Sequence, residues 1–332
     1  MSPHADSPLQ PATVLWRTTV PGTAAQRLWV DDRTGRVLVS DGWGVGFGAL
    51  RLRALDMATG AEVAAVALGN QARAVARDGE DGVLVATDTR LFRLDADTLE
   101  VLQKWTTRIP RYSDQLLLAG GHVHAINASA AHLSAMRLPE GSVRRRVLEE
   151  DLQIHPTLDG NILAVAATGS VWLAQPGLDR PPQRIARTQP VCHSTMDGTG
   201  RLWLSLGRGR VREGNRVSWA APTPNAGCMD PPYNTFTAFD LGMDFWQMAS
   251  TQDGNVVSVA AATMTRGEAP RYVQASVASF RTHDRHRLSW VQAPEDFEIV
   301  SMYPQAGRAF ATRCLWQKEG DAEVSELVCL RL

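Results

Sequence analysis

The chain repeats one pattern seven times, and this repetition constrains its fold more than any other feature of the sequence. Each copy has a short run of alternating apolar and polar residues, a turn that contains Asp or Gly, and a second run rich in Val, Leu and Ala. Turn residues between two alternating runs predict a β-hairpin, because alternation places every second side chain on the same face of a strand. The seven copies begin near residues 26, 72, 115, 153, 191, 247 and 298.

Two further candidate strands follow the hairpin in the first two copies. In the first copy they are residues 49–56 and 62–68, and in the second copy they are residues 90–95 and 100–108. Four strands in about 45 residues match the length of one blade of a β-propeller. The sequence therefore predicts an all-β fold, a seven-bladed β-propeller built of four-stranded blades.

The last copy predicts how the ring closes. It supplies three strands before the chain stops, so one outer strand is missing. Residues 13–21 (TVLWRTTVP) are similar to residues 100–110 (EVLQKWTTRIP), the outer strand of the second copy. We therefore expect an N-terminal outer strand to join the last blade and close the ring, which would remove exposed sheet edges. A pair of β-sandwiches, the alternative architecture, does not predict this match.

Composition limits the partners and the compartment. The chain of 332 residues has 34 basic and 35 acidic side chains, so it lacks the cationic excess that nucleic-acid binding needs. Residues 1–12 are polar and proline-rich, without a signal peptide's apolar run, and no stretch approaches a membrane span. The four cysteines form no C-x-x-C pair, which is typical of reduced thiols. We expect a cytoplasmic monomer with no nucleic-acid or membrane partner, made of a flexible tail (1–12) and one domain (13–332).

Two kinds of turn resemble known propeller repeats. Residues 53–63 (RALDMATGAEV) and 93–101 (RLDADTLEV) resemble the turn signature of quinoprotein-like and YVTN-type repeats. Residues 159–161 (DGN) and 197–203 (DGTGRLW) are similar to the hairpins of streptogramin-lyase-like propellers. The resemblance implies a propeller fold. The tryptophan ring and cofactor residues of quinoprotein enzymes are not recognisable in this sequence, so it implies no quinone, and we predict no cofactor.

Long loops are expected to gather on one face of the ring. In a propeller, the loops between second and third strands share a face with the connections between blades, and loops on a rigid scaffold often bind ligands. From these loops we select Trp43, Asp230 and Tyr233 as candidate ligand-binding residues. The alternative is that the loops are tolerated insertions without a ligand. The four long loops are residues 41–48, 221–244, 263–272 and 315–325.

Polar residues recur where the inner strands begin, at the predicted mouth of the central channel. One interpretation is a ring of amides that hydrogen-bond water and free backbone groups. The other is a polar collar that holds the carbonyl or hydroxyl groups of a ligand, which makes the glutamines ligand-binding candidates. The residues are Gln26, Gln115, Gln153, Gln247 and Glu298.

Two histidines follow at matching positions of adjacent copies. His155 and His193 each lie two residues after the start of the inner strand, so both imidazoles could reach one metal or one substrate proton. With Glu298 they form the candidate catalytic set. The alternative is that both histidines are hydrogen-bonded packing residues.

The absence of a recognised catalytic motif favours a binding function. We expect a binding or scaffold propeller that recognises a protein segment or a small molecule on its long-loop face. The alternative is a metal-assisted lyase or hydrolase at the mouth of the central channel. It would use His155, His193 and Glu298, with a divalent metal at that mouth.

Overall fold

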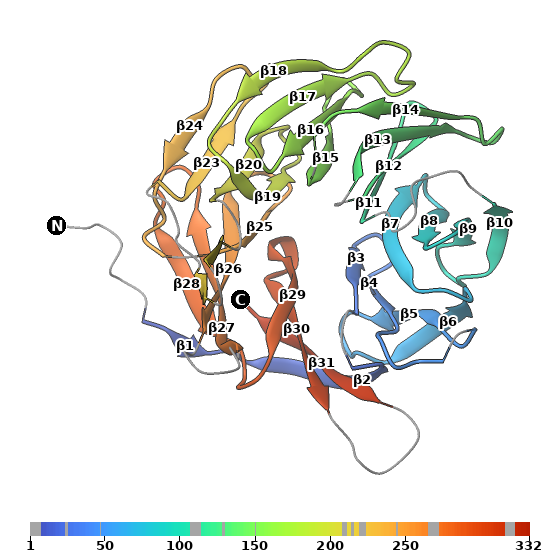
Figure 1. The fold of residues 1–332 in the computed structure, drawn as a ribbon. Helices are drawn as coiled ribbons and strands as arrows, with labels where there is room; N and C mark the ends of the chain where they lie inside the picture. The colour runs from blue at the N-terminus through green and yellow to red at the C-terminus, as the bar shows by residue number, and fades with distance from the viewer. Residues whose placement is uncertain are drawn as a thin grey trace.

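Seven β-sheets form a ring around a central channel, as predicted (Figure 1). The structure is a computed structural model. The only helix among the residues that it describes is the short 3-10 helix Pro304–Ala306. No helix in this part of the chain is long and apolar enough to cross a membrane. The described residues are 8–23, 26–46, 48–106, 114–127, 130–149, 151–207, 211–213, 216–218, 224–243, 245–264, 272–315 and 323–332.

Each blade has four antiparallel strands, and blade 6 has one further, parallel strand at its outer edge. The strands run in chain order from the channel outward, except for the two N-terminal strands, which join the outer edges of blades 6 and 7. Blades 1 and 2 consist of β3 (Leu28–Asp31), β4 (Arg36–Ser40), β5 (Arg51–Asp56) and β6 (Glu62–Ala67), then β7 (Ala72–Asp78), β8 (Gly82–Thr87), β9 (Leu91–Asp95) and β10 (Val101–Trp105). Blades 3 and 4 consist of β11 (Gln115–Ala119), β12 (His122–Asn127), β13 (Ala130–Arg137) and β14 (Val143–Val147), then β15 (Leu152–Pro156), β16 (Ile162–Ala166), β17 (Ser170–Ala174) and β18 (Gln183–Arg187).

The remaining blades include insertions and the N-terminal strands. Blade 5 consists of β19 (Val191–Met196), β20 (Leu202–Leu206), β23 (Ala226–Met229) and β24 (Thr237–Phe239). Blade 6 consists of β25 (Gln247–Ser250), β26 (Val256–Met264), β27 (Tyr272–Arg281), β28 (Arg287–Gln292) and β1 (Gln10–Pro11). Blade 7 consists of β29 (Glu298–Tyr303), β30 (Arg308–Leu315), β31 (Val324–Arg331) and β2 (Val14–Pro21).

The N-terminal strand closes the ring where the sequence predicts it. Strand β2 pairs antiparallel with β31, from Val14 opposite Leu330 to Pro21 opposite Val324. One further strand precedes it, because β1 adds in parallel to the outer edge of blade 6. Two residues of the segment expected to be a tail are therefore part of a sheet, and residues 1–7 lie outside the described residues.

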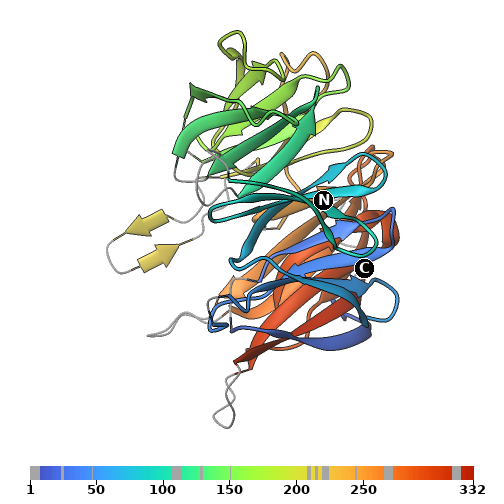
Figure 2. The ribbon, with the colours of Figure 1, turned by 90° about the vertical axis from the view of Figure 1, so that its right-hand side faces the viewer.

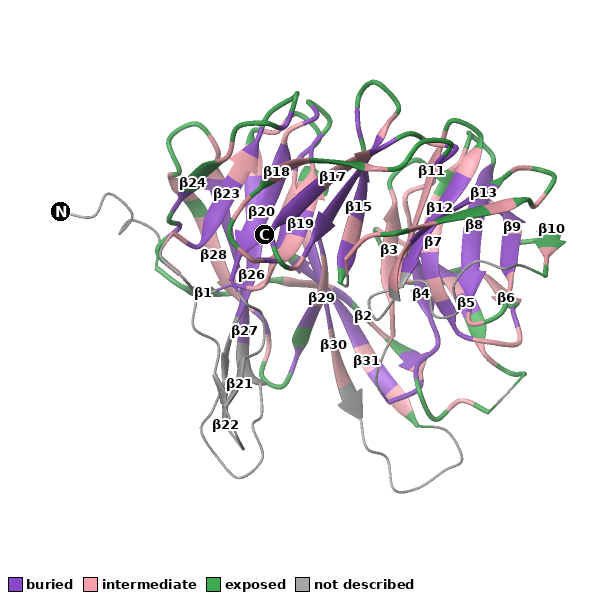
Figure 3. Ribbon diagram, turned by 45° about the horizontal axis from the view of Figure 1, so that its top comes forward, coloured by how far each residue is buried: buried purple, intermediate pink, exposed green. Residues whose placement is uncertain are grey.

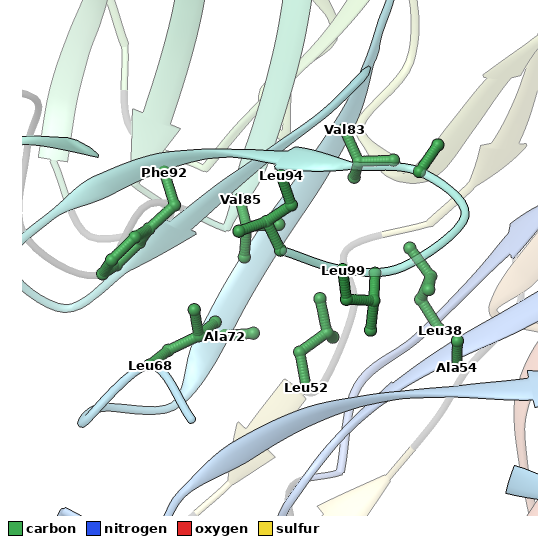
Figure 4. Packing of buried hydrophobic residues seen from close by; sticks show 11 residues of the cluster. Leu38, Leu52, Ala54, Leu68, Ala72, Val83, Val85, Phe92, Leu94 and Leu99 are labelled. Carbon is green, nitrogen blue, oxygen red and sulfur yellow. The ribbon is translucent and has the colours of Figure 1, made fainter. Parts of the chain in front are cut away.

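Seven apolar clusters hold the blades together, one at each junction between neighbouring blades. Alternation along a strand sends successive side chains to opposite junctions. In β31, Val328 and Leu330 pack toward blade 6, whereas Leu327 and Cys329 pack toward blade 1. Buried residues run along strands such as β8, β16 and β20, while β10 at the rim is exposed (Figure 3). Figure 4 shows the cluster between blades 1 and 2.

One large contact locks the closing strand onto blade 1. The Trp16 side chain of β2 is buried, its indole Nε1 donates to the Met57 carbonyl at 2.9 Å, and its ring centroid lies 6.0 Å from that of Phe310. Gly60 sits against this ring with φ +73°, and a Cβ there would lie 2.5 Å from a Trp16 ring carbon. The turn at residues 57–60, identified in the sequence as a blade turn, therefore also receives the side chain that closes the ring.

The prediction of a long loop at residues 221–244 is wrong, because this segment contains β23 and β24, the two outer strands of blade 5. Both strands are short and lie among proline and glycine residues, so they lack the alternation that marks the other strands. The insertion in blade 5 comes earlier, between β20 and β23. There β21 (Val211–Glu213) pairs with β22 (Arg216–Ser218) in a separate hairpin that projects from the ring (Figure 2).

Candidate binding surface on the long-loop face

The face of the ring that carries the connections between β2 and β3 and between β4 and β5 has an ordered, exposed tryptophan. Trp43 lies between β4 and β5, and its side chain is 65% exposed. The Gly22 amide, at the end of β2, donates to the Glu323 carbonyl just before β31, so three segments meet here. We call the group formed by residues 22–23, 41–44 and 323–325 the Trp43 platform.

Asp41 holds the platform to blades 1 and 2. The residue is only 1% exposed, and its carboxylate accepts hydrogen bonds from the Arg51 amide at 2.9 Å and from Arg53 Nε at 2.7 Å. Its carbonyl accepts from Gln71 Nε2 at 3.0 Å, which joins the loop to blade 2. A buried carboxylate is stabilised only when its oxygens are hydrogen-bonded, so these partners define one position for the loop.

The segment that leaves β2 supports the other side of the platform. The Trp43 carbonyl accepts from the Thr23 amide at 2.9 Å, and the Gly42 amide donates to the Pro21 carbonyl at 2.9 Å. Gly22 has φ +98°, and a Cβ there would lie 2.4 Å from the Gly42 backbone, so only glycine allows this approach. The loop is therefore bonded on both sides while its indole faces solvent.

Gln26 belongs to this closure rather than to the channel mouth. Its Nε2 donates to the Gly22 carbonyl at 2.8 Å and to Ser325 Oγ at 2.9 Å, and Ser325 Oγ also donates to the Gly22 carbonyl. The amide thus ties the segment leaving β2 to the start of β31. It stabilises the platform on which Trp43 stands.

At the channel wall, polar side chains of one blade bond the inner strand of the next. Gln115 Oε1 accepts from the Ile154 amide at 2.8 Å. Gln153 Oε1 accepts from the Ser194 amide at 2.7 Å, and its Nε2 donates to the Cys192 carbonyl at 3.2 Å. Inner strands have a free edge toward the channel, and buried backbone groups need partners there. The amides supply these partners and act as clips between blades.

His193 continues the same series, and this corrects its predicted alignment with His155. Gln153 bonds the residues on either side of His193, and the Met248 amide donates to His193 Nδ1 at 3.4 Å, next to Gln247. His193 is therefore the blade 5 counterpart of Gln153. The sequence alignment misses this because blade 5 has a β-bulge between Val191 and His193.

His155 lies deeper than His193 and bonds across the same junction. It is buried, with its Nε2 2.7 Å from Ser194 Oγ. Burial lowers the pKa of His155 to about 3, with a smaller contribution from nearby His193, and burial lowers the pKa of His193 to about 4. Both imidazoles are therefore neutral at pH 7. His155 hydrogen-bonds across the junction between blades 4 and 5, and His193 hydrogen-bonds across the junction between blades 5 and 6.

Glu298 stands apart from the histidines, at the start of β29 in blade 7. Its side chain reaches water, while desolvation by the surrounding protein raises the pKa of its carboxyl. Among the described residues, no hydrogen bond or ion pair joins it to His155 or His193, and no group of three or more His, Cys, Asp or Glu side chains could hold a metal ion.

Asp230 and Tyr233 lie on the opposite face from the Trp43 platform, contrary to their expected place. Both follow β23, where a third strand leads to a fourth, beside the β19–β20 turn. The Tyr233 hydroxyl donates to the Gly200 carbonyl at 2.8 Å, and Arg201 Nε donates to Asp230 at 2.6 Å. Tyr233 is only 5% exposed. These residues hold two turns together and are not part of the long-loop face.

A group of charged residues that connects blades 1, 2 and 3 was not predicted from the sequence. Arg27 donates to the Arg73 carbonyl at 2.8 Å and pairs with Asp114 at 2.7 Å, and Arg73 lies 3.6 Å from the same carboxylate. Arg27 thus bonds the inner strand of blade 2 as Gln153 bonds that of blade 5. The signal was available, since Arg27 and Arg73 both lie next to the start of an inner strand.

The clips predict a sharp difference between two channel glutamines. Gln153→Ala should lower the free energy of unfolding by about 1–3 kcal/mol, because it removes the hydrogen bonds that Gln153 makes to the Ser194 amide and the Cys192 carbonyl. Gln247→Ala is the matched control and should change it by less than about 0.5 kcal/mol, since the side-chain amide of Gln247 has no hydrogen bond to any described residue. Urea unfolding of both variants measures this, and equal losses would contradict the role given to Gln153.

Comparison with known proteins supports the fold but identifies no family. No protein-family model and no curated protein matches the chain. The crystal structure of the Cps50 (Swd1) β-propeller domain of Myceliophteria thermophila is similar, with a TM-score of 0.63 and 11% identity over 97% of this chain and 100% of that chain. At this identity the likeness shows the propeller fold alone. The resemblance to quinoprotein-like, YVTN-type and streptogramin-lyase-like repeats has no family-level support.

Proposed function

We propose that the protein is a binding module that recognises a partner protein through its long-loop face, with Trp43 as the central contact. The observation that carries the proposal is the exposed indole on a loop bonded from both sides by Asp41 and Thr23. Tryptophan is enriched among the residues that dominate protein interfaces. A loop already held in one conformation loses little entropy on binding, which favours affinity.

The ring supports this role mechanically. Seven apolar junctions and the polar clips between inner strands make a stiff scaffold, and a stiff scaffold allows its loops to vary without loss of the fold. The platform also joins blade 7, the N-terminal segment and blade 1 through Gln26. A partner on this surface would contact both ends of the chain and would stabilise the closed ring by mass action.

Trp43→Ala is expected to weaken partner binding about 30-fold, the equivalent of the 2 kcal/mol that defines a dominant interface residue. A photoreactive amino acid at position 45, two residues from Trp43 in the same loop, would capture the partner for identification by mass spectrometry. The purified partner would then be titrated calorimetrically against each variant. Protein stability should change by less than about 0.5 kcal/mol, because Trp43 is 65% exposed.

Leu102→Ala is the matched control for this titration. Leu102 is also a large exposed apolar residue, 53% exposed, but it lies on the outer strand β10 away from the platform. Its replacement should leave affinity within about twofold, since surface substitutions away from a contact have effects within about 0.5 kcal/mol. Unchanged affinity in Trp43→Ala, or an equal loss in Leu102→Ala, would contradict the proposal.

A further inference from the structure

A cavity of about 460 Å³ opens between the inner strands of blades 7, 1 and 2. Its apolar walls come from Trp29 and Leu38 of blade 1 and from Val75 and Val83 of blade 2, with Met302 of blade 7 opposite. Leu38 and Val83 belong to the cluster between blades 1 and 2 drawn in Figure 4. The volume lies within the range of pockets that hold small molecules.

The charged residues of the cavity lie at the other end of the inner strands from the Trp43 platform. Its polar residues are Asp31 and Asp32 at the end of β3, Arg77 near the end of β7, and Ser301 of β29. These positions lie beside the turns that lead from first to second strands. The loops on the long-loop face join second to third strands, so the two surfaces face opposite sides of the ring.

The residues that line this cavity carry one excess negative charge, because they include two carboxylates and one guanidinium. Arg77 Nη2 lies 3.1 Å from Asp32 Oδ1 and 3.5 Å from Asp31 Oδ1, so one guanidinium serves two carboxylates. The neutral hydroxyls of Thr34 and Tyr303 bond Asp31 and Asp32, respectively. Neither hydroxyl cancels a charge, and the pair of carboxylates is held in place beside the apolar walls.

Arg33 follows Asp32 in the same turn and is exposed to solvent, whereas the guanidinium of Arg36 is directed away from the rim. Arg36 is opposite Asp31 in the β3–β4 register, but its guanidinium bonds the Ala96 carbonyl at 3.1 Å and approaches Asp97 in the turn of blade 2. Among the described residues that line the cavity, Arg77 is the only cation. Partly desolvated carboxylates beside an apolar wall attract a cation that carries apolar surface.

We propose that this cavity binds a small organic cation, an amine with an apolar body. The body would lie between the walls formed by Trp29 and Val75, and the ammonium group would meet Asp31 and Asp32 at the rim. Arg77 competes with that ammonium group for the same carboxylates. This site is independent of the proposed partner surface and needs no residue of the Trp43 platform.

Three probes with one apolar body and different charges test the proposal: 2-phenylethylamine, 2-phenylethanol and phenylacetate. Calorimetry on the full-length protein should show the amine binding at least about tenfold more tightly than the alcohol or the acid, since one favourable charge contact of 1.4 kcal/mol is a factor of ten. Amine binding equal to or weaker than alcohol binding, tightest binding of the acid, or no saturable amine binding at millimolar concentration would overturn it.

Two charge-changing variants are expected to shift the affinity for the amine in opposite directions, which simple hydrophobic binding does not predict. Asp32→Asn should weaken amine binding severalfold, whereas Arg77→Gln should strengthen it by freeing both carboxylates. Glu140→Gln removes an exposed carboxylate of blade 3 outside the cavity lining and should change nothing. Trp43→Ala should also leave amine binding intact, which separates a failure here from a failure of the proposed function. Thermal melting checks that each variant is folded, and folded variants that bind the amine equally would overturn the site.

Discussion

Trp16→Ala is expected to lower the free energy of unfolding by about 3–5 kcal/mol, the range for truncating a large buried aromatic. The side chain is buried between the closing strand and blade 1, packs near Phe310 and donates to the Met57 carbonyl. Its removal leaves a cavity at the junction that holds the ring closed and takes away one of the two hydrogen bonds that the Met57 carbonyl accepts, the other coming from Arg308. Urea denaturation followed by circular dichroism measures the loss.

Arg17→Ala, at the next position of the same strand, is the control. Its side chain is 53% exposed and pairs with Glu326, which Arg313 also binds at 2.7 Å. Such a surface pair contributes about 0–1 kcal/mol. Similar losses for Trp16→Ala and Arg17→Ala would show that closure does not depend on the buried contact.

Stability is expected to fall as the pH is lowered from 7 to 5. Desolvation is the main cause that lowers the pKa of His124 to about 4 and that of His155 to about 3, both below the ordinary value of 6.5. In the unfolded chain these imidazoles bind protons from pH 6.5 downward, whereas in the folded protein they stay neutral until about pH 4. At pH 5 each imidazole therefore lowers the free energy of unfolding by about 2 kcal/mol, since one pKa unit is 1.36 kcal/mol.

Carboxylates do not produce a loss in this window. The pKa values of Asp159 and Asp253 are lowered, chiefly by hydrogen bonds from Thr157 and Thr251, so their contribution disappears only when the pH falls below the ordinary carboxyl range. His155→Gln should reduce the slope of unfolding free energy against pH between 6.5 and 5. His283→Gln, at a 71% exposed side chain, should leave it unchanged. A slope of zero in the wild-type protein would contradict the burial of these imidazoles.

The architecture could be predicted because its signals are local. Alternation and turn residues identify each hairpin, and the strand at residues 13–21 shows where the ring closes. The two outer strands of blade 5 were not predicted, since β23 and β24 are too short for alternation to be visible. Local pattern predicts strands only where each strand spans several alternating pairs.

The candidate site was less predictable because it depends on contacts between blades. Trp43 was selected from its loop, but the bonds from Asp41 and Thr23 that fix it join residues distant in the sequence. His193 and Gln153 occupy equivalent positions in their blades because of a β-bulge in blade 5, and nothing in the sequence indicates that bulge. The cavity beside Trp29 depends on the spacing of inner strands, which is a property of the closed ring.

Amide hydrogen exchange of the protein with and without its captured partner tests the central claim, that the long-loop face at Trp43 is the binding surface. We predict slower exchange in a peptide spanning residues 41–46 when the partner is bound. The turn at residues 197–201, which Tyr233 holds on the opposite face, should exchange at the same rate in both states. Protection of the 197–201 turn without protection of residues 41–46 would contradict the claim.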